Sequence, residues 1–160
     1  MFETGYYVRD AEEMEVFGLV EASHEVLRES VYGHMDLNKE KTANFLMDGI
    51  LKRPNTFFRC ISDKNGELVG GMMCVCDTSL FGADKIAYDV TIMVKKEHRG
   101  KCLPQLIQII REYKDWATAE GAKMIKIGVS SGINIDKASS FFERLGFDRV
   151  GSMHSARVGA

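Results

Sequence analysis

The chain has 160 residues, of which 45% are hydrophobic and 28% are charged, as is typical of a folded protein with a single core. We therefore expect one domain over residues 1–160. Twenty-one Lys and Arg against 23 Asp and Glu give a formal charge of −2, which excludes a global basic field for nucleic acids or anionic membranes. Uncharged runs are also too short for a membrane-spanning helix.

The termini and cysteines indicate the compartment. The first residues lack the basic start and apolar stretch of a secretory signal, so we expect a cytoplasmic protein. The four cysteines form no CxxC pair and have no nearby His pair, so we predict neither a metal site nor a disulfide framework.

A short strand over residues 4–9 and two helices are predicted in the first third of the chain. Asp10 is placed to cap the first helix, with Glu13 at the reciprocal position of a capping box. Its predicted buried stripe comprises Met14, Phe17, Val20, Leu27 and Val31. The second helix is expected from about Asn38 to Lys52.

From residue 57 the spacing of the hydrophobic residues changes from the helical period to that of strands. Residues 57–61 and 68–76 read as a hairpin, and 86–94 as a third strand. A long helix over 103–120 follows, and the remaining segments alternate in type: a strand at 124–129, a helix at 136–145, and one or two closing strands over 147–158. This order predicts an α/β (α+β) fold with a mixed, mostly antiparallel central sheet and helices on both faces.

The junction between the third strand and the long helix is rich in cations. Lys95, Lys96, Arg99 and Lys101 surround the positive end of the helix, which favours binding of an anion such as a phosphate. The alternative is a solvated turn that carries a few lysines.

Two segments resemble motifs of a known family. Val94-Lys95-Lys96-Glu97-His98-Arg99-Gly100-Lys101 resembles the V-x-P-E-x-R-G-K-G-x-G signature of the GCN5-related N-acetyltransferases (GNAT). The segment from Asn134 to Phe147 is similar to the family's second motif, a helix that ends in Leu-Gly-Phe. The resemblance implies the GNAT fold, acetyl-CoA as cofactor and an amine as acceptor. Asp84, Trp116-Ala117 and the loop 130–134 look most like members encoded by bacteriophages.

The resemblance also implies which residues bind acetyl-CoA. The strand backbone would hydrogen-bond the pantetheine arm, the loop and helix start would hold the pyrophosphate, and Asn134 would reach the arm or the thioester. The implied set is Ile92, Met93, Val94, Arg99, Gly100, Lys101, Cys102, Leu103, Pro104, Asn134 and Phe142. The alternative for Asn134 is a helix cap or plain loop residue.

The sequence departs from the family at three of these positions. Cys102 and Pro104 replace the two later glycines of the signature, and Pro104 removes one N–H that could face a phosphate. Cys102 is either a buried inert thiol or, at a helix N-terminus among cations, one with a lowered pKa that forms a mixed disulfide with oxidised CoA. Phe142 stands where many members carry a tyrosine that protonates the leaving thiolate.

Because a thiolate is a tolerable leaving group, Phe142 indicates a reduced need for an acid, and water, Ser130, Ser131 or Tyr88 could supply the proton. The candidate general base is Asp89, with Thr91 predicted on the same strand face to hold a water. The alternative for Asp89 is a structural carboxylate.

The resulting prediction is an acetyl-CoA-dependent N-acetyltransferase that transfers directly, within a ternary complex, to an amine of a small molecule or protein. Asp89 and Asn134 are its predicted catalytic residues. Residues 32–36 fall where acceptors bind in similar proteins, a homodimer is compatible with the family, and no metal, membrane or nucleic-acid partner is expected. Two alternatives are an inactive CoA-binding or protein-interaction module, and a phage enzyme that modifies a nucleic-acid base or host protein.

Overall fold

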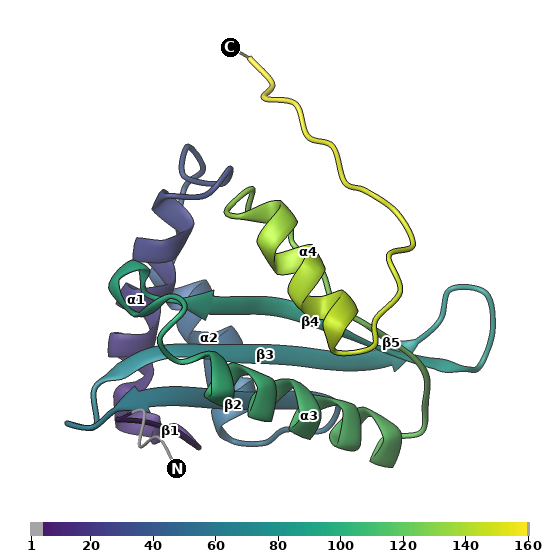
Figure 1. Cartoon of the computed structure of the whole chain (residues 1–160), viewed down its shortest axis with the longest axis horizontal. Helices are drawn as coiled ribbons and strands as arrows, with labels where there is room; N and C mark the ends of the chain where they lie inside the picture. Colours follow the sequence, from purple (N-terminus) through teal and green to yellow (C-terminus); the bar gives the residue numbers. More distant parts are fainter. Residues whose placement is uncertain (1–4, 160) are drawn as a thin grey trace.

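The computed structural model describes residues 5–159, which form one five-stranded sheet with helices on both faces (Figure 1). In chain order the elements are β1 (Tyr6–Arg9), the 3-10 turn η1 (Glu13–Glu15), α1 (Val16–Arg28), α2 (Lys39–Ile50), β2 (Thr56–Asp63), β3 (Leu68–Thr78), β4 (Lys85–Val94), the 3-10 turn η2 (Lys96–His98), α3 (Leu103–Ala119), β5 (Ala122–Lys126) and α4 (Ile135–Arg144).

The sheet order is β1-β2-β3-β4-β5. Each neighbouring pair from β1 to β4 is antiparallel, whereas β5 runs parallel to β4 after the α3 crossover. The predicted mixed, mostly antiparallel sheet is therefore confirmed.

Two separate cores hold the layers together, one on each face of the sheet. The core under α3 and α4 contains Ile61, Met72, Cys74, Ile110, Tyr113 and Phe142. The core under α1 and α2 contains Val16, Leu19, Leu46, Phe58, Cys60 and Met73. Successive residues such as Met72 and Met73 serve opposite cores, as the two-residue period of a strand requires.

The first helix is placed differently from the prediction. Of the predicted stripe, Val20 is buried as expected, but Met14, Phe17 and Val31 are 81%, 75% and 43% exposed. Val16 and Leu19 are buried in place of Met14 and Phe17. The reason lies in η1, whose capping box is formed by Glu12 and Glu15 and which shifts the start and phase of α1.

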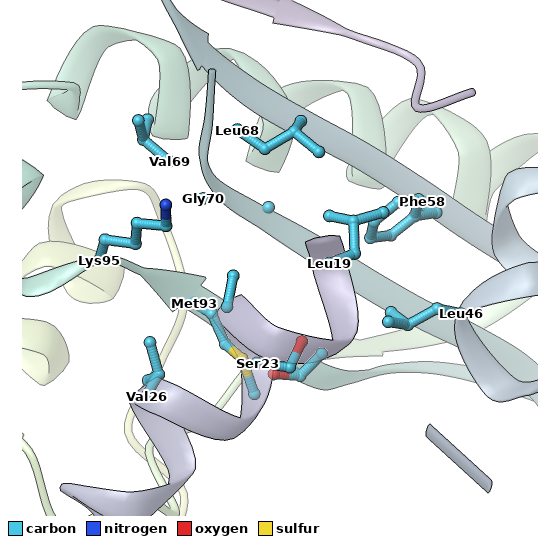
Figure 2. Close-up of a pocket in the computed structure, with 13 residues that line it drawn as sticks. Leu19, Ser23, Val26, Leu46, Phe58, Leu68, Val69, Gly70, Met93 and Lys95 are labelled. Atoms are coloured by element: carbon cyan, nitrogen blue, oxygen red, sulfur yellow. The ribbon is translucent and has the colours of Figure 1, made fainter. Parts of the chain in front are cut away.

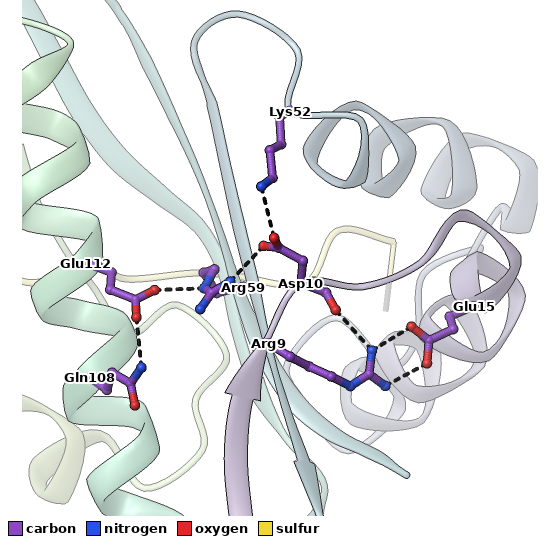
Figure 3. A network of polar contacts seen from close by, with 7 residues as sticks. All are labelled: Arg9, Asp10, Glu15, Lys52, Arg59, Gln108 and Glu112. Atoms are coloured by element: carbon purple, nitrogen blue, oxygen red, sulfur yellow. Dashed lines mark hydrogen bonds and ion pairs between the residues drawn. The ribbon is translucent and has the colours of Figure 1, made fainter. Parts of the chain in front are cut away.

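Asp10, the predicted cap, belongs to a polar network instead (Figure 3). Its carboxylate accepts hydrogen bonds from Lys52 at 2.9 Å and from Arg59 at 2.8 Å. Arg59 of β2 also donates to Glu112 of α3 at 2.7 Å, and Arg9 of β1 pairs with Glu15 of η1. The network thus links β1, β2, α3 and the end of α2.

The one or two closing strands predicted over residues 147–158 are absent from the part of the chain that the structure describes. Phe147 packs against the core under α3 and α4, with Lys114 Nζ 4.5 Å from its ring centroid, but residues 148–159 are exposed and extended (Figure 1). Val150 and Met153 are three positions apart, so a strand would place them on opposite faces and could not bury both on one side.

Candidate active site

A large cavity lies where β4 and β5 diverge. The two strands pair only between Lys85–Tyr88 and Ala122–Lys126, and among residues 5–159 no strand pairs with the same edge of β4 beyond Tyr88. The backbone from Asp89 to Val94 therefore has free hydrogen-bonding groups at this edge, beside a cavity of about 980 Å³.

The cavity brings together most of the predicted site residues. Its wall includes Asp89, Ile92, Met93, Val94, Arg99, Gly100, Cys102, Leu103, Asn134 and Phe142. Lys101 and Pro104 are exposed and lie outside the wall. The missing N–H of Pro104 therefore removes no donor from the wall itself.

Asp89 is the titratable group with the most altered environment in this cavity. Burial raises the pKa of its carboxyl to about 6, although backbone N–H groups of Asp89 and Gly128 donate to it and oppose the rise. A carboxylate whose pKa lies close to neutrality and faces a cavity suits a general base.

A β-bulge separates Asp89 from Thr91. Cys74 of β3 pairs with Asp89 and Met73 pairs with Thr91, so Val90 is an extra residue in β4. Cys74 belongs to the core under α3 and α4 and Met73 to the core under α1 and α2, so Asp89 and Thr91 serve opposite faces. The prediction that the two share a face is wrong, although both side chains reach the cavity.

The cationic loop is partly neutralised by acids that the sequence did not point to. The Arg99 guanidinium pairs bidentately with Glu29 and its Nε donates to the Val94 carbonyl at 3.0 Å. Lys95 Nζ donates to Glu67 at 2.8 Å. Lys96 and Lys101 are exposed.

Cys102 is the N-cap of α3 and is 2% exposed. Burial raises the pKa of its thiol above the ordinary value, and Sγ lies 3.6 Å from the His98 carbonyl oxygen. Loss of solvent therefore outweighs the helix end, which argues against a lowered pKa of this thiol. Cys102 is buried, as one of the two interpretations expected, and its inertness toward oxidised CoA stays a prediction.

Asn134 occupies the N-cap position of α4 but does not use its side chain as a cap. Its backbone is left-handed, with φ 48° and ψ 44°, and its carbonyl accepts the Ala138 N–H at 3.0 Å. Because Asn134 lines the cavity and its side-chain amide does not cap the helix, this amide is available to contact a ligand.

Phe142 is 9% exposed and its ring packs against those of Phe141 and Phe147. Of the hydroxyl groups proposed to replace a tyrosine there, those of Ser130 and Ser131 belong to cavity-wall residues, whereas Tyr88 lies outside the wall.

Sequence reasoning missed several polar residues of the wall. Ser23 and Ser30 come from α1 and its end, Thr42 from α2, and Ser140 from α4. The four are far apart in the chain, and only the spacing of Ser140 within the second motif offered a signal.

A second, smaller cavity of about 40 Å³ lies on the α1 side of the sheet (Figure 2). Its wall is mostly apolar and includes Leu19, Val26, Leu46, Phe58 and Met93. Val26, Leu46 and Met93 also line the large cavity, so the two spaces are neighbours.

The residues present fit an elongated phosphate-bearing thioester such as acetyl-CoA. The free edge of β4 offers backbone hydrogen bonds, the start of α3 has no side-chain cap, and Gly100 (φ 78°) leaves open space at the loop. The cavity is large, and its lining is mostly apolar with a few polar groups, as ligand sites usually are.

Comparisons with solved structures agree with this fold. The chain is similar to glucosamine-6-phosphate N-acetyltransferase from Arabidopsis thaliana, at 13% identity and a TM-score of 0.68, over 96% of this chain and 98% of that one. It is also similar to an acetyltransferase from Trypanosoma brucei and to an aminoglycoside acetyltransferase from an uncultured soil metagenomic sample. Each of these two has 17% identity and a TM-score of 0.65, over 96% of this chain and 99% of the other.

These likenesses show that the chain has the fold of known acetyltransferases. No protein-family model matches the sequence, and neither does any curated protein. Within residues 5–159, no helix is long and apolar enough to cross a bilayer, and no three His, Cys, Asp or Glu side chains are grouped to hold a metal ion.

Proposed function

We propose that the protein is an acetyl-CoA-dependent N-acetyltransferase that transfers an acetyl group directly to an amine. The observation that supports this most is the position of Asp89, a carboxylate with a pKa raised to about 6, in a cavity along the free edge of β4. The cationic loop and the start of α3 border the same cavity.

In this proposal the chain's own groups divide the work of binding. The backbone of Ile92, Met93 and Val94 hydrogen-bonds the cofactor arm, and Arg99 with the N–H groups around Gly100 holds its phosphates. The amide of Asn134 orients the reacting end. Bound acetyl-CoA supplies an acetyl thioester, which is the electrophile.

Asp89 acts as the general base. An acceptor amine that arrives as an ammonium must lose one proton before its nitrogen can attack, and the Asp89 carboxylate accepts that proton directly or through a water. The new C–N bond would replace the C–S bond, and the nitrogen would lose its second proton. That proton would reach the departing thiolate through water or through the hydroxyl of Ser130 or Ser131, which is thereby reprotonated. Phe142 cannot donate one.

The test measures binding before turnover. Acetyl-CoA should raise the melting temperature of the protein, and free thiol should then appear when amines or peptides are added. No stabilisation by acetyl-CoA would refute the cofactor assignment.

A second candidate is favoured by Phe142, the residue that removes the usual proton donor. It is a module with this fold that binds CoA, or another protein, without catalysis. Stabilisation by acetyl-CoA, with no release of CoA thiol when any member of a broad amine panel is added, would support this module. The likeness to bacteriophage enzymes, a cytoplasmic location, a homodimer and a nucleic-acid or host-protein target remain sequence-based predictions.

A further inference from the structure

We propose that Glu29 and the segment after it, residues 29–32, form a latch over the cavity, closed by the ion pair with Arg99 and opened when a phosphate takes the place of the Glu29 carboxylate. This inference rests on the proposed function and concerns how the same site is regulated. Residues 29–32 are called the latch below.

The first side of the latch is the contact with the cationic loop. Two nitrogens of the Arg99 guanidinium, Nη1 and Nη2, each donate to a different oxygen of Glu29, while Nε is held by the Val94 carbonyl. The fork that a guanidinium presents to a phosphate is the same fork that it presents to a carboxylate. Glu29 therefore occupies the face of Arg99 that a phosphate would use.

The second side of the latch is fixed to the loop before α4. The Val31 N–H donates to the Ser131 carbonyl at 2.9 Å, and a Cβ built on Gly132 would lie 2.7 Å from Val31 Cγ1. The end of α1 and the start of α4 accordingly lie near each other in Figure 1. The latch thus joins two walls of the cavity that are otherwise separate.

The latch also belongs to the cavity itself, because Ser30 and Tyr32 are part of its wall. A change at Arg99 is therefore transmitted to the part of the wall that precedes residues 32–36, where the acceptor is predicted to bind. Because the cofactor phosphate would open the latch, the cofactor would bind first and the acceptor amine second.

The ion pair between Arg99 and Glu29 holds the latch closed but is weak enough for a phosphate to displace it. The side chains of Arg99 and Glu29 are 23% and 30% exposed, so solvent screens their attraction. A phosphate carries more charge and more acceptor oxygens than a carboxylate and can displace it. If the closed state is favoured by about three- to tenfold, the apparent affinity for the cofactor is reduced by the same factor.

The test compares two variants with the same change in charge. Glu29→Gln removes the ion pair, and Glu25→Gln is its control, since Glu25 is exposed on α1 one turn earlier and has no ion pair with any residue between 5 and 159. Titration calorimetry with CoA should give a dissociation constant about three- to tenfold lower for Glu29→Gln than for Glu25→Gln. Equal or weaker binding by Glu29→Gln would overturn the latch.

A second measurement uses the wild-type protein and so does not depend on a variant. Hydrogen exchange at the Val31 amide should become faster when CoA binds, because opening the latch frees this N–H from Ser131. Slower exchange would mean that the latch closes on the cofactor and would contradict the proposal. If the wild type binds CoA but both readouts fail, only the latch is wrong; if it binds no CoA, the proposed function fails and the latch with it.

Discussion

Asp89 and Thr91 are two residues apart on β4, yet they serve opposite faces of the sheet because Val90 is inserted between them as a bulge. The bulge lies directly after Tyr88, the last residue of β4 that pairs with β5. Asp89 stays in phase with Ala87, which belongs to the core under α3 and α4, and the bulge moves Thr91 to the opposite face. A partly buried acid thus lies on the α3 and α4 side, at the start of the free strand edge.

The first prediction concerns the stability of Asp89→Asn. Burial raises the folded-state pKa of Asp89 to about 6 from an ordinary value of 3.8. Between pH 3.8 and about 6 the folded protein therefore binds more protons than the unfolded chain. The free energy of unfolding consequently falls as the pH rises through this window. Because asparagine does not ionise, Asp89→Asn avoids this fall, and its free energy of unfolding at pH 8 should exceed that of the wild type by roughly 1–3 kcal/mol.

Urea unfolding at several pH values checks this result. The advantage of Asp89→Asn should shrink steadily below pH 6 and vanish near pH 4. An advantage that is constant with pH would show that the carboxyl is not desolvated in the folded protein.

The second prediction concerns turnover of the same variant. If Asp89 is the base, Asp89→Asn should lower the rate of thiol release strongly at pH 7 and less at pH 9, where more of the acceptor amine is already neutral. The wild-type rate should fall as the pH drops through about 6. Equal losses for the variant at pH 7 and pH 9 would assign Asp89 a structural role.

The third prediction separates the backbone of Asn134 from its side chain. Glycine tolerates φ 48° better than asparagine does, and the Asn134 side chain caps nothing, so Asn134→Gly should change the free energy of unfolding by less than about 1 kcal/mol. Loss of the amide should lower acetyl transfer at least about tenfold. Unaltered kinetics would remove Asn134 from the site.

The fourth prediction concerns Cys102. Its thiol is 2% exposed and burial raises its pKa, so the native protein should keep its intact mass after treatment with CoA disulfide. All four cysteines are buried and should react with a thiol reagent only in denaturant. Addition of one CoA to the native protein at neutral pH would show that Cys102 becomes accessible.

Local signals predicted most of the fold. The strand β4, the cationic loop and α3 follow one another without interruption, as the residue pattern predicted. Arg99 and Gly100 of this loop, which the family resemblance singled out, border the cavity. The second helix begins close to Asn38, as predicted, and Asn38 is its N-cap, because its side chain accepts the Lys41 N–H at 2.8 Å. In both cases the decisive contacts lie within a few residues of each other.

The features that escaped prediction depend on residues distant in the chain. The bulge at Val90 is a shift in register between two strands, and no residue pattern within β4 reveals it. Glu29 and Arg99 are 70 positions apart, so no local pattern of residues indicates that they pair. The prediction of closing strands over 147–158 is wrong for the same reason. Strand-forming residues become a strand only where another strand is in position to pair with them.

The most direct test of the central claim maps where acetyl-CoA binds by hydrogen exchange. We predict that acetyl-CoA slows exchange at backbone amides of residues 89–94 and of the loop 95–101, which border the cavity at the free edge of β4, and leaves β2 (Thr56–Asp63) unchanged. Binding without protection of residues 89–94, or protection confined to another part of the chain, would contradict the account.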